Sequence, residues 1–245
     1  MSVFRTLFHS EAGAIAYHDV ADHGLRAIVS RPYRVREYAC KRLIDFVLAS
    51  VALVVSAPAW IVIAAAIRLE DGGPVFFRQS RWGRERRPFE VYKFRSMSVN
   101  ADARIQAGEN DSRFTRVGRF LRATSLDELP QVVNIWRGEM SWVGPRALPI
   151  NERQRNEPGE LPDSAVRGFD KRCSVRPGLT GIAQVFGPRD FPRHQKFRYD
   201  GFYIERQSAW LDLRLIAMSV WISLRLRWET REAKVNARGR RRARP

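Results

Sequence analysis

Residues 46–67 read FVLASVALVVSAPAWIVIAAAI, a stretch of 22 residues without a charged side chain. As an α-helix this stretch would extend about 33 Å, at 1.5 Å per residue, and the hydrocarbon core of a bilayer is about 30 Å thick. A buried helix of a globular core rarely continues past about 18 apolar residues without a polar face. The stretch therefore predicts a membrane helix, and the rest of the architecture is interpreted around it.

Basic residues flank this stretch on both sides. Those before it are Arg31, Arg34, Arg36, Lys41 and Arg42, and those after it are Arg68, Arg78, Arg81, Arg84, Arg86 and Arg87. Because Lys and Arg gather on the cytoplasmic side of membrane segments, both ends are predicted to be cytoplasmic. A helix that crosses the membrane straight through does not allow this, whereas a helix that enters, breaks and returns does.

The middle of the stretch contains a candidate break. Pro58 removes one backbone donor and kinks a helix, and the hydroxyl of Ser56 can bond a carbonyl that the kink frees. Proline also occurs in ordinary membrane-spanning helices. These features alone leave a re-entrant helix and a kinked spanning helix about equally supported.

The whole chain is strongly basic. It has 245 residues with 43 Lys and Arg against 26 Asp and Glu, which gives a net charge of +17. Such a chain needs an anionic partner, which can be nucleic acid, an anionic membrane face or a phosphorylated substrate. Its two cysteines, Cys40 and Cys173, cannot make a disulfide framework, so a reducing, cytosolic side is predicted.

Four segments are predicted along the chain. Residues 1–37 form a polar extension without an apolar run long enough for a signal peptide, and residues 38–70 hold the membrane helix. Residues 71–228 form a cytoplasmic domain, and residues 229–245 are a basic tail. Beside a membrane, each basic residue of such a tail contributes about 1 kcal/mol of attraction to anionic lipids.

The cytoplasmic domain is predicted to be mainly helical, with one small β-hairpin. Residues 74–78 and 89–94 have the composition of strands, and residues 83–86 suit the turn between them. Helical periodicity returns in residues 114–136. Residues 210–228 mix apolar residues with arginines and tryptophans, which suits an amphipathic helix in the membrane interface as well as ordinary core packing. The predicted fold class is therefore α+β.

Two adjacent carboxylates, Asp127 and Glu128, stand out in the helical region. They follow four arginines spaced every third residue, Arg113, Arg116, Arg119 and Arg122. Helix capping is the simpler interpretation, because Ser125 and Glu128 fit a capping box and Asp127 can be an N-cap. In a basic membrane-bound chain the pair also suits phosphate chemistry, since a carboxylate can attack phosphorus and its neighbour can hold Mg²⁺. Further cations for a phosphate are available from Lys93, Arg95 and Arg146.

Six short motifs occur in order along the chain. They are Phe77-Arg78-Gln79, Tyr92-Lys93-Phe94-Arg95-Ser96-Met97, Thr115-Arg116-Val117-Gly118-Arg119-Phe120-Leu121-Arg122, Asp127-Glu128-Leu129-Pro130-Gln131, Val143-Gly144-Pro145-Arg146 and Pro177-Gly178-Leu179-Thr180-Gly181. From about Cys40 to Arg225 the chain resembles the bacterial sugar transferases, also called monotopic phosphoglycosyl transferases. Without a large membrane domain ahead of these motifs, it resembles the minimal form of these enzymes.

The resemblance implies an activity and a place in the cell. A UDP-sugar would give its sugar 1-phosphate to polyprenyl (undecaprenyl) phosphate, with release of UMP, as the first step of exopolysaccharide, lipopolysaccharide or glycoconjugate assembly. The enzyme would lie at the cytoplasmic face of the bacterial inner membrane, in contact with anionic lipids. Downstream glycosyltransferases would be possible partners, and nucleic acid would not be one.

The resemblance also assigns roles to residues. Asp127 would be the covalent nucleophile and Glu128 the Mg²⁺ ligand. The residues expected to bind the substrate and its phosphates are Lys93, Arg95, Arg122, Gln131 and Arg146. The membrane helix would be re-entrant and broken at Ser56 and Pro58, which favours that alternative over a spanning helix.

Two departures from the family pattern affect these expectations. The helix break reads Ser56-Ala57-Pro58, with one residue between the serine and the proline that are usually adjacent. The usual Pro-Arg-Pro is Pro145-Arg146-Ala147, which keeps the arginine but leaves open how its loop is held rigid.

Two other classes of function fit part of the sequence. A nucleic-acid-binding protein would also be basic, but the apolar stretch and the lack of a recognisable reading motif argue against it. A membrane-anchored adaptor without catalysis would leave the carboxylate pair and its ordered arginines unexplained. A turnover assay separates the adaptor from an enzyme.

Overall fold

The structure is a computed structural model that describes residues 37–101, 111–150, 166, 168–187 and 193–225. Nearly all of the predicted N-terminal extension and the whole predicted basic tail lie outside these residues. The elements in chain order are α2 (Lys41–Asp71), β1 (Phe76–Trp82), η2 (Arg84–Arg86), β2 (Pro88–Phe94), α3 (Arg116–Thr124), η3 (Leu126–Glu128), α4 (Gln131–Arg137), β3 (Ser141–Val143), α5 (Phe169–Arg172), β4 (Gly178–Thr180), α6 (Ile182–Phe186), α7 (Arg193–Arg206) and α8 (Ala209–Leu224).

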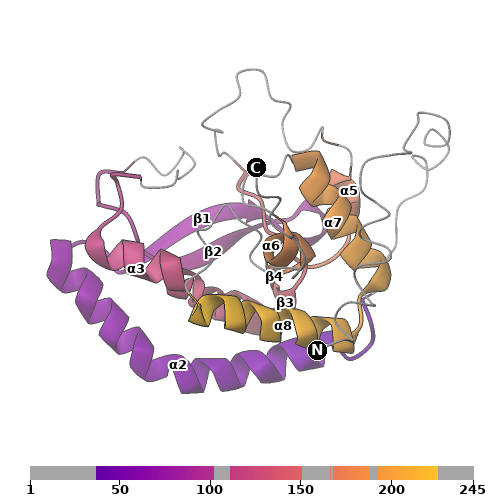
Figure 1. Cartoon of the computed structure of the whole chain (residues 1–245), viewed down its shortest axis with the longest axis horizontal. Coiled ribbons are helices and arrows are strands. Elements are labelled where there is room, and N and C mark those ends of the chain that lie inside the picture. The colour runs from indigo at the N-terminus through magenta and orange to yellow at the C-terminus, as the bar shows by residue number, and fades with distance from the viewer. Residues whose placement is uncertain (1–36, 102–110, 151–165, 167, 188–192, 226–245) are drawn as a thin grey trace, which may run out of the picture. The chain divides into compact units, whose positions relative to one another are not determined.

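The described part of the chain is mainly helical with two small sheets, as the α+β prediction requires (Figure 1). Strands β1 and β2 form the predicted antiparallel hairpin, in a register that pairs Phe76 with Phe94 and Trp82 with Pro88. Strands β3 and β4 form a short parallel pair that aligns Val143 with Thr180. This second pair was not predicted, because three-residue strands far apart in the chain leave no periodic pattern to detect.

The predicted apolar helix is confirmed as α2, a single helix of 31 residues. Among the described residues it is the one helix long and apolar enough to cross a membrane, and only 6% of its most apolar 18-residue window is buried. Side chains along its length are exposed, for example Val54, Val55 and Ile61. It is therefore not the core helix of a globular domain.

Helix α2 is bent, and it remains helical through Pro58 (Figure 1). The predicted break thus takes the form of a bend within one helix. The hydroxyl of Ser56 accepts a hydrogen bond from the indole Nε1 of Trp60 at 3.0 Å. Ser56 thereby connects two successive turns on the two sides of Pro58.

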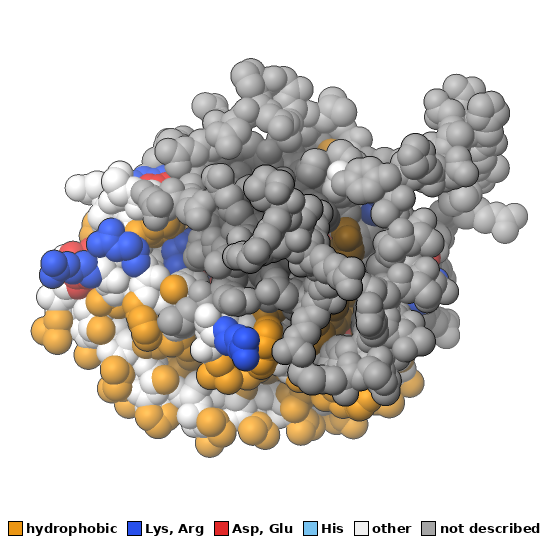
Figure 2. All heavy atoms as spheres, viewed as in Figure 1, with side chains coloured by type: hydrophobic (Ala, Val, Ile, Leu, Met, Phe, Trp, Pro, Cys, Tyr) orange, Lys and Arg blue, Asp and Glu red, His pale blue; other side chains and the backbone are white. Residues whose placement is uncertain are grey.

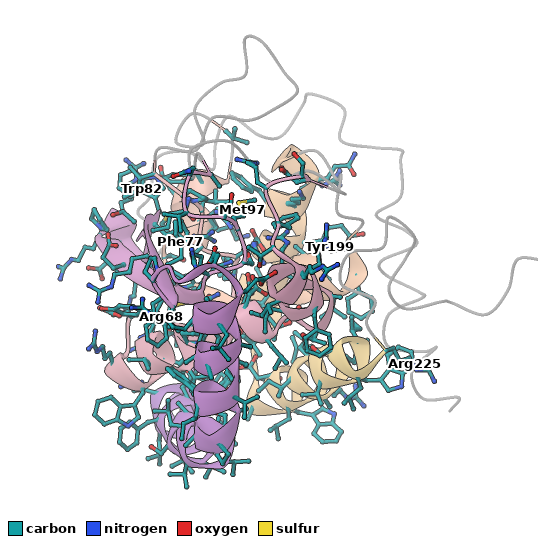
Figure 3. The ribbon with its side chains drawn as sticks, turned by 90° about the vertical axis from the view of Figure 1, so that its left-hand side faces the viewer. Arg68, Phe77, Trp82, Met97, Tyr199 and Arg225 are labelled. Carbon is teal, nitrogen blue, oxygen red and sulfur yellow. The ribbon has the colours of Figure 1, made fainter. Side chains whose placement is uncertain are left out.

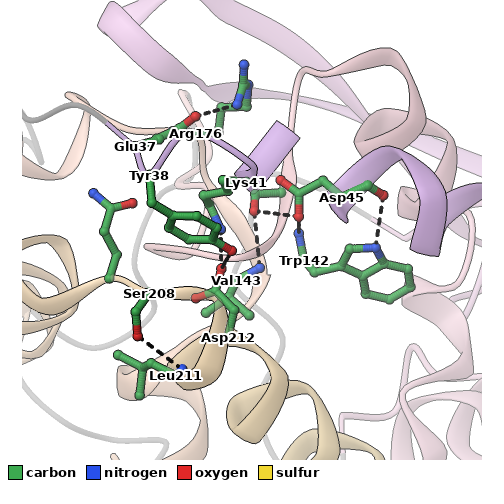
Figure 4. A network of polar contacts seen from close by, with 12 residues as sticks. Glu37, Tyr38, Lys41, Asp45, Trp142, Val143, Arg176, Ser208, Leu211 and Asp212 are labelled. Carbon is green, nitrogen blue, oxygen red and sulfur yellow. Dashed lines mark hydrogen bonds and ion pairs between the residues drawn. The ribbon is translucent and has the colours of Figure 1, made fainter. Parts of the chain in front are cut away.

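The N-terminal end of α2 is anchored to α8 and β3 by a buried polar network (Figure 4). The ammonium of Lys41, which is 1% exposed, donates to Asp212 at 2.5 Å. The hydroxyl of Tyr203 donates to the other carboxylate oxygen of Asp212 at 2.8 Å. One turn along the helix, Asp45 accepts hydrogen bonds from the hydroxyl of Ser141 and the backbone N–H of Trp142.

The C-terminal end of α2 is anchored to the hairpin and α3. Asp71 forms an ion pair with Arg95, the residue that directly follows β2. The carboxylate of Glu70 accepts from the backbone N–H groups of Arg116 and Val117 at 2.6 and 3.1 Å. These are the first two residues of α3, whose N–H groups have no partner inside that helix. Both ends of α2 are therefore attached to the same body.

Hydrophobic packing joins the remaining elements to this frame. One buried cluster connects β3, α6, α7 and α8 through Val143, Val185, Tyr203 and Leu215. Helix α8 keeps a second apolar face exposed, which carries Trp210, Leu213, Val220, Trp221 and Leu224. Hydrophobic side chains gather along the edge of the molecule where α2 lies (Figure 2), and the side chains of α2 and α8 project on that same side (Figure 3).

Candidate active site

The carboxylate pair lies in the single 3₁₀ turn η3, between α3 and α4. Ser125 has a φ of 60°, in the left-handed region, and this conformation turns the chain from α3 into η3. Its side chain makes no capping hydrogen bond, and the Glu128 side chain bonds to other elements instead. The capping interpretation is therefore wrong, and both acidic side chains are available for other chemistry.

Glu128 is bound by two cations that come from different elements. Its Oε1 atom accepts from the Nζ of Lys93 on β2 at 2.6 Å and from an Nη of Arg146 at 3.0 Å. Burial alone would raise the pKa of Glu128, but the two cations outweigh burial and hold that pKa well below its usual range. Glu128 is therefore ionised at neutral pH.

Asp127 is buried, with 5% of its surface exposed. Burial raises the pKa of its carboxyl to about 6, and the negative charge of Glu128 adds to this effect. The positive charges of Lys93, Arg122 and Arg146 act in the opposite direction. Five of the predicted site residues, two acids and three cations, are thus brought together from β2, α3, η3 and the loop after β3.

Arg95 and Gln131 are placed differently. Arg95 points toward the end of α2, where it pairs with Asp71, while its buried Nε and Nη1 atoms have no hydrogen-bond partner among the described residues. Gln131, the first residue of α4, is buried, and its amide nitrogen likewise has no partner in the described part of the chain. Both side chains therefore retain buried donors without a partner among the described residues.

The motifs at residues 143–146 and 177–181 both contain glycine, and they pack directly against each other. A Cβ atom added to Gly178 would lie 2.0 Å from the backbone nitrogen of Gly144, and one added to Gly181 would lie 2.3 Å from the Gly144 oxygen. Any larger residue would separate the two backbones. The sequence motifs around Gly144 and Gly178 are thus two halves of one support, which holds Arg146 facing Glu128.

Arg81 is a site residue that the sequence did not single out. It is buried at the end of β1 and donates to the carbonyl of Ala147 at 2.8 Å. The positive charge of Arg81 also lowers the pKa values of Lys93 and Glu128, so Arg81 lies close to these two side chains. Nothing in the sequence separates Arg81 from the exposed arginines around it, because its burial depends on how the hairpin docks.

The site contains two carboxylates that are candidate ligands for a divalent cation. Within the residues that the structure describes, no group of three or more His, Cys, Asp or Glu side chains could hold a metal ion. Magnesium, however, is usually held by one or two carboxylates together with the phosphates of its substrate and water. The adjacent carboxylates of Asp127 and Glu128 fit that simpler arrangement.

The chain is similar to known proteins over most of its length. The model of the family described as bacterial sugar transferase matches residues 36–226. The chain is 44% identical over 190 residues to the UDP-glucose:undecaprenyl-phosphate glucose-1-phosphate transferase of Klebsiella pneumoniae. The aligned region covers 74% of this chain and 39% of that protein. It is also 40% identical over 184 residues to the exopolysaccharide production protein PSS of Rhizobium leguminosarum bv. phaseoli. This aligned region covers 72% of this chain and 90% of that protein.

The chain spans about two fifths of the length of the first curated relatives that it matches, at 39% of each. The family model, in contrast, covers most of the chain, and the PSS protein is matched over nearly its whole length. The chain therefore belongs to the bacterial sugar transferase family.

Proposed function

We propose that this protein transfers a sugar 1-phosphate from a UDP-sugar to undecaprenyl phosphate or a similar polyprenyl phosphate, and releases UMP. The observation that carries the proposal is a buried carboxylate, Asp127, beside a second carboxylate that Lys93 and Arg146 hold in place. The names of relatives that act on UDP-glucose and undecaprenyl phosphate support the choice of substrates.

The proposed reaction has two displacements at one phosphorus atom. An oxygen of the Asp127 carboxylate bonds to the phosphorus that bears the sugar, and the bond from this phosphorus to the bridging oxygen breaks, so that UMP leaves with the electron pair. A phosphate oxygen of the polyprenyl phosphate then bonds to the same phosphorus, and the bond to Asp127 breaks. Splitting the transfer in this way lets one site serve a water-soluble donor and a lipid acceptor in turn.

The neighbouring residues have distinct roles in this proposal. Lys93, Arg122 and Arg146 stabilise the negative charge of the diphosphate, since charged donors bind phosphate oxygens strongly. Arg95 and Gln131 bind the UDP-sugar through the N–H groups that have no partner among the described residues. Glu128 would hold Mg²⁺, which when bound supplies positive charge that offsets the charge of the phosphates.

We also propose that α2 is re-entrant and that both of its ends lie on the cytoplasmic side of the inner membrane. A helix of 31 residues is about 46 Å long, more than the roughly 30 Å hydrocarbon core. If α2 crossed straight through, its ends would lie on opposite faces of the membrane. The ion pairs of Lys41 with Asp212 and of Asp71 with Arg95 attach the two ends to one body, and this supports a helix that returns to its starting face. The exposed apolar face of α8 would lie in the same interface.

The covalent step is tested with the donor alone. Purified protein incubated with UDP-glucose, or with another member of a UDP-sugar panel, should release one equivalent of UMP and gain a sugar phosphate at Asp127, detected by mass spectrometry. Asp127→Asn keeps the shape of the side chain but removes the nucleophile, so it should abolish both the adduct and turnover. Substantial activity in Asp127→Asn, or UMP release only when both substrates are present, would contradict the covalent scheme. No turnover with any sugar would favour the adaptor.

A further inference from the structure

The loop that carries Arg146 is held by its backbone carbonyls. We call residues 144–148 the Arg146 loop. Four successive carbonyls of this loop each accept a hydrogen bond: Pro145 O from Gly178 N at 2.9 Å, Arg146 O from Arg172 Nη2 at 2.6 Å, Ala147 O from Arg81 Nη1 at 2.8 Å, and Leu148 O from Trp82 N at 2.9 Å. The loop is therefore held by three elements: the last residue of α5, the first residue of β4 and the end of β1.

Two of these four donors are buried arginine side chains, and each is oriented by a separate anchor. The Nε of Arg172 donates to Asp200 on α7 at 3.1 Å, and its guanidinium lies 4.5 Å from the ring centroid of Phe197. Arg81 donates through Nε and Nη2 to the Oε1 atom of Gln79. A planar guanidinium can bind its anchor with one edge and a carbonyl with another, which the single ammonium of a lysine cannot do.

We propose that Arg81 and Arg172 are positioning residues, which hold the Arg146 loop so that the Arg146 guanidinium faces Glu128 and the phosphates of the donor. Position 147 is alanine in this chain, so the loop lacks the rigidity of a proline there, and the two buried arginines provide it from outside. The role in catalysis rests on the proposed function. The hold on the loop itself rests on the hydrogen bonds alone.

The two arginines differ in how cleanly they test this idea. Arg81 also acts electrostatically on Lys93 and Glu128, so its replacement changes the charge balance of the site directly. Among the described residues, the Arg172 side chain contacts Asp200, Phe197 and the Arg146 carbonyl, and none of these is a carboxylate of the site. Arg172→Lys, which keeps the positive charge near Asp200, is therefore the more informative variant.

A matched control is available at Arg176. This side chain also pairs with a carboxylate, that of Glu37, and also donates to a backbone carbonyl, that of Gly138 at 3.1 Å. Its carbonyl partner lies in a different loop. Arg176→Lys thus makes the same chemical change with the same kind of partners, and neither of these two partners belongs to the Arg146 loop.

The experiment has one readout that does not depend on activity. In the full-length protein in detergent, hydrogen–deuterium exchange followed by mass spectrometry should be faster by about 10-fold or more in the peptide containing residues 144–149 for Arg172→Lys. Arg176→Lys should leave this peptide unchanged. Unchanged exchange in both variants would overturn the positioning role, whatever the sugar specificity proves to be.

The second readout is the steady-state kinetics with UDP-glucose and undecaprenyl phosphate as probes. Arg172→Lys should lower kcat by about 10-fold, with a smaller change in KM, because Arg146 is displaced where charge develops in the transition state. Adding Ala147→Pro to Arg172→Lys should restore part of kcat and slow the exchange of the loop. Faster exchange with unchanged kcat would overturn the catalytic part of the inference. A wild-type protein that uses no UDP-sugar would contradict the proposed function, while the exchange result would still stand or fall alone.

Discussion

At the scale of single residues, the pKa of Asp127 decides the pH range in which the proposed nucleophile works. The carboxylate is the reactive form, and burial raises its pKa to about 6. Activity should therefore be present above this pKa and be lost as the pH falls through it. We expect log kcat/KM for the donor to fall with a slope of one below about pH 6 and to level off above it.

Glu128 gives this pH profile an internal check. Its negative charge contributes to the raised pKa of Asp127, while Lys93 opposes that rise. Glu128→Gln removes the like charge and leaves Lys93 in place, so the residual activity should show its midpoint at a lower pH. Lys93→Met should move the midpoint to a higher pH. Equal midpoints in all three proteins would mean that the profile reports another group.

Arg95 raises a different question at the same scale, because it can serve α2, the substrate or both. Its pairing with Asp71 holds the end of α2, while its buried Nε and Nη1 atoms have no partner in the described residues. If these donors bind phosphate, Arg95→Ala should lower kcat/KM by about 10- to 100-fold. Asp71→Asn, which removes only the ion pair, should have a smaller effect. Equal losses in the two variants would restrict Arg95 to anchoring the helix.

At the scale of elements, the two attached ends of α2 give a direct test of membrane topology. Cys40 is exposed immediately before α2, and Cys173 is buried. In a Cys173→Ser background, Cys40 reports on the N-terminal side, and Arg84→Cys combined with Cys40→Ser reports on the C-terminal side. Both cysteines should resist a membrane-impermeant thiol reagent in intact cells and react in inverted vesicles. Labelling of one site alone in intact cells would indicate a spanning helix.

Sequence patterns predicted those elements whose cause is local. The uncharged stretch at residues 46–67 and the strand-like composition of residues 74–78 and 89–94 do not depend on the rest of the chain. Both the helix and the hairpin were confirmed, with the first strand displaced to Phe76–Trp82. The carboxylate pair was identified, but its capping interpretation was wrong because the Glu128 partners, Lys93 and Arg146, lie 35 and 18 residues away in the sequence.

At the scale of the whole molecule, the features that could not be predicted from the sequence are those that depend on how distant elements pack against one another. Strand pairing between β3 and β4 requires the close backbone approach of Gly144 and Gly178, which the motifs suggest only once their contact is known. The burial of Arg81 depends likewise on the contact between the hairpin and the Arg146 loop. A catalytic motif is therefore easier to locate in a sequence than the residues that hold it in position.

The apolar faces of α2 and α8 lie on one side of the molecule (Figure 3). We expect this side to affect only one of the two half-reactions that we propose. The donor is water-soluble, whereas the acceptor lies in the membrane. If α8 sets the depth of the site at the interface, replacing Leu213, Val220 and Leu224 together by serine should alter access to the lipid acceptor only. Because α2 still provides a large apolar surface, the triple variant should stay in the membrane.

We therefore expect the triple α8 variant to form the Asp127 adduct and release UMP from the donor at a rate close to that of the wild type. Transfer from the adduct to undecaprenyl phosphate in vesicles should slow by about 10-fold or more, since each leucine or valine side chain contributes roughly 1.5–3 kcal/mol when it is buried in an apolar phase. Val99→Ser, which changes an exposed apolar residue after the hairpin, serves as the control and should affect neither step. Equal slowing of both half-reactions would show that α8 supports the fold of the site. An unchanged second half-reaction would mean that α2 alone places the active site at the membrane surface.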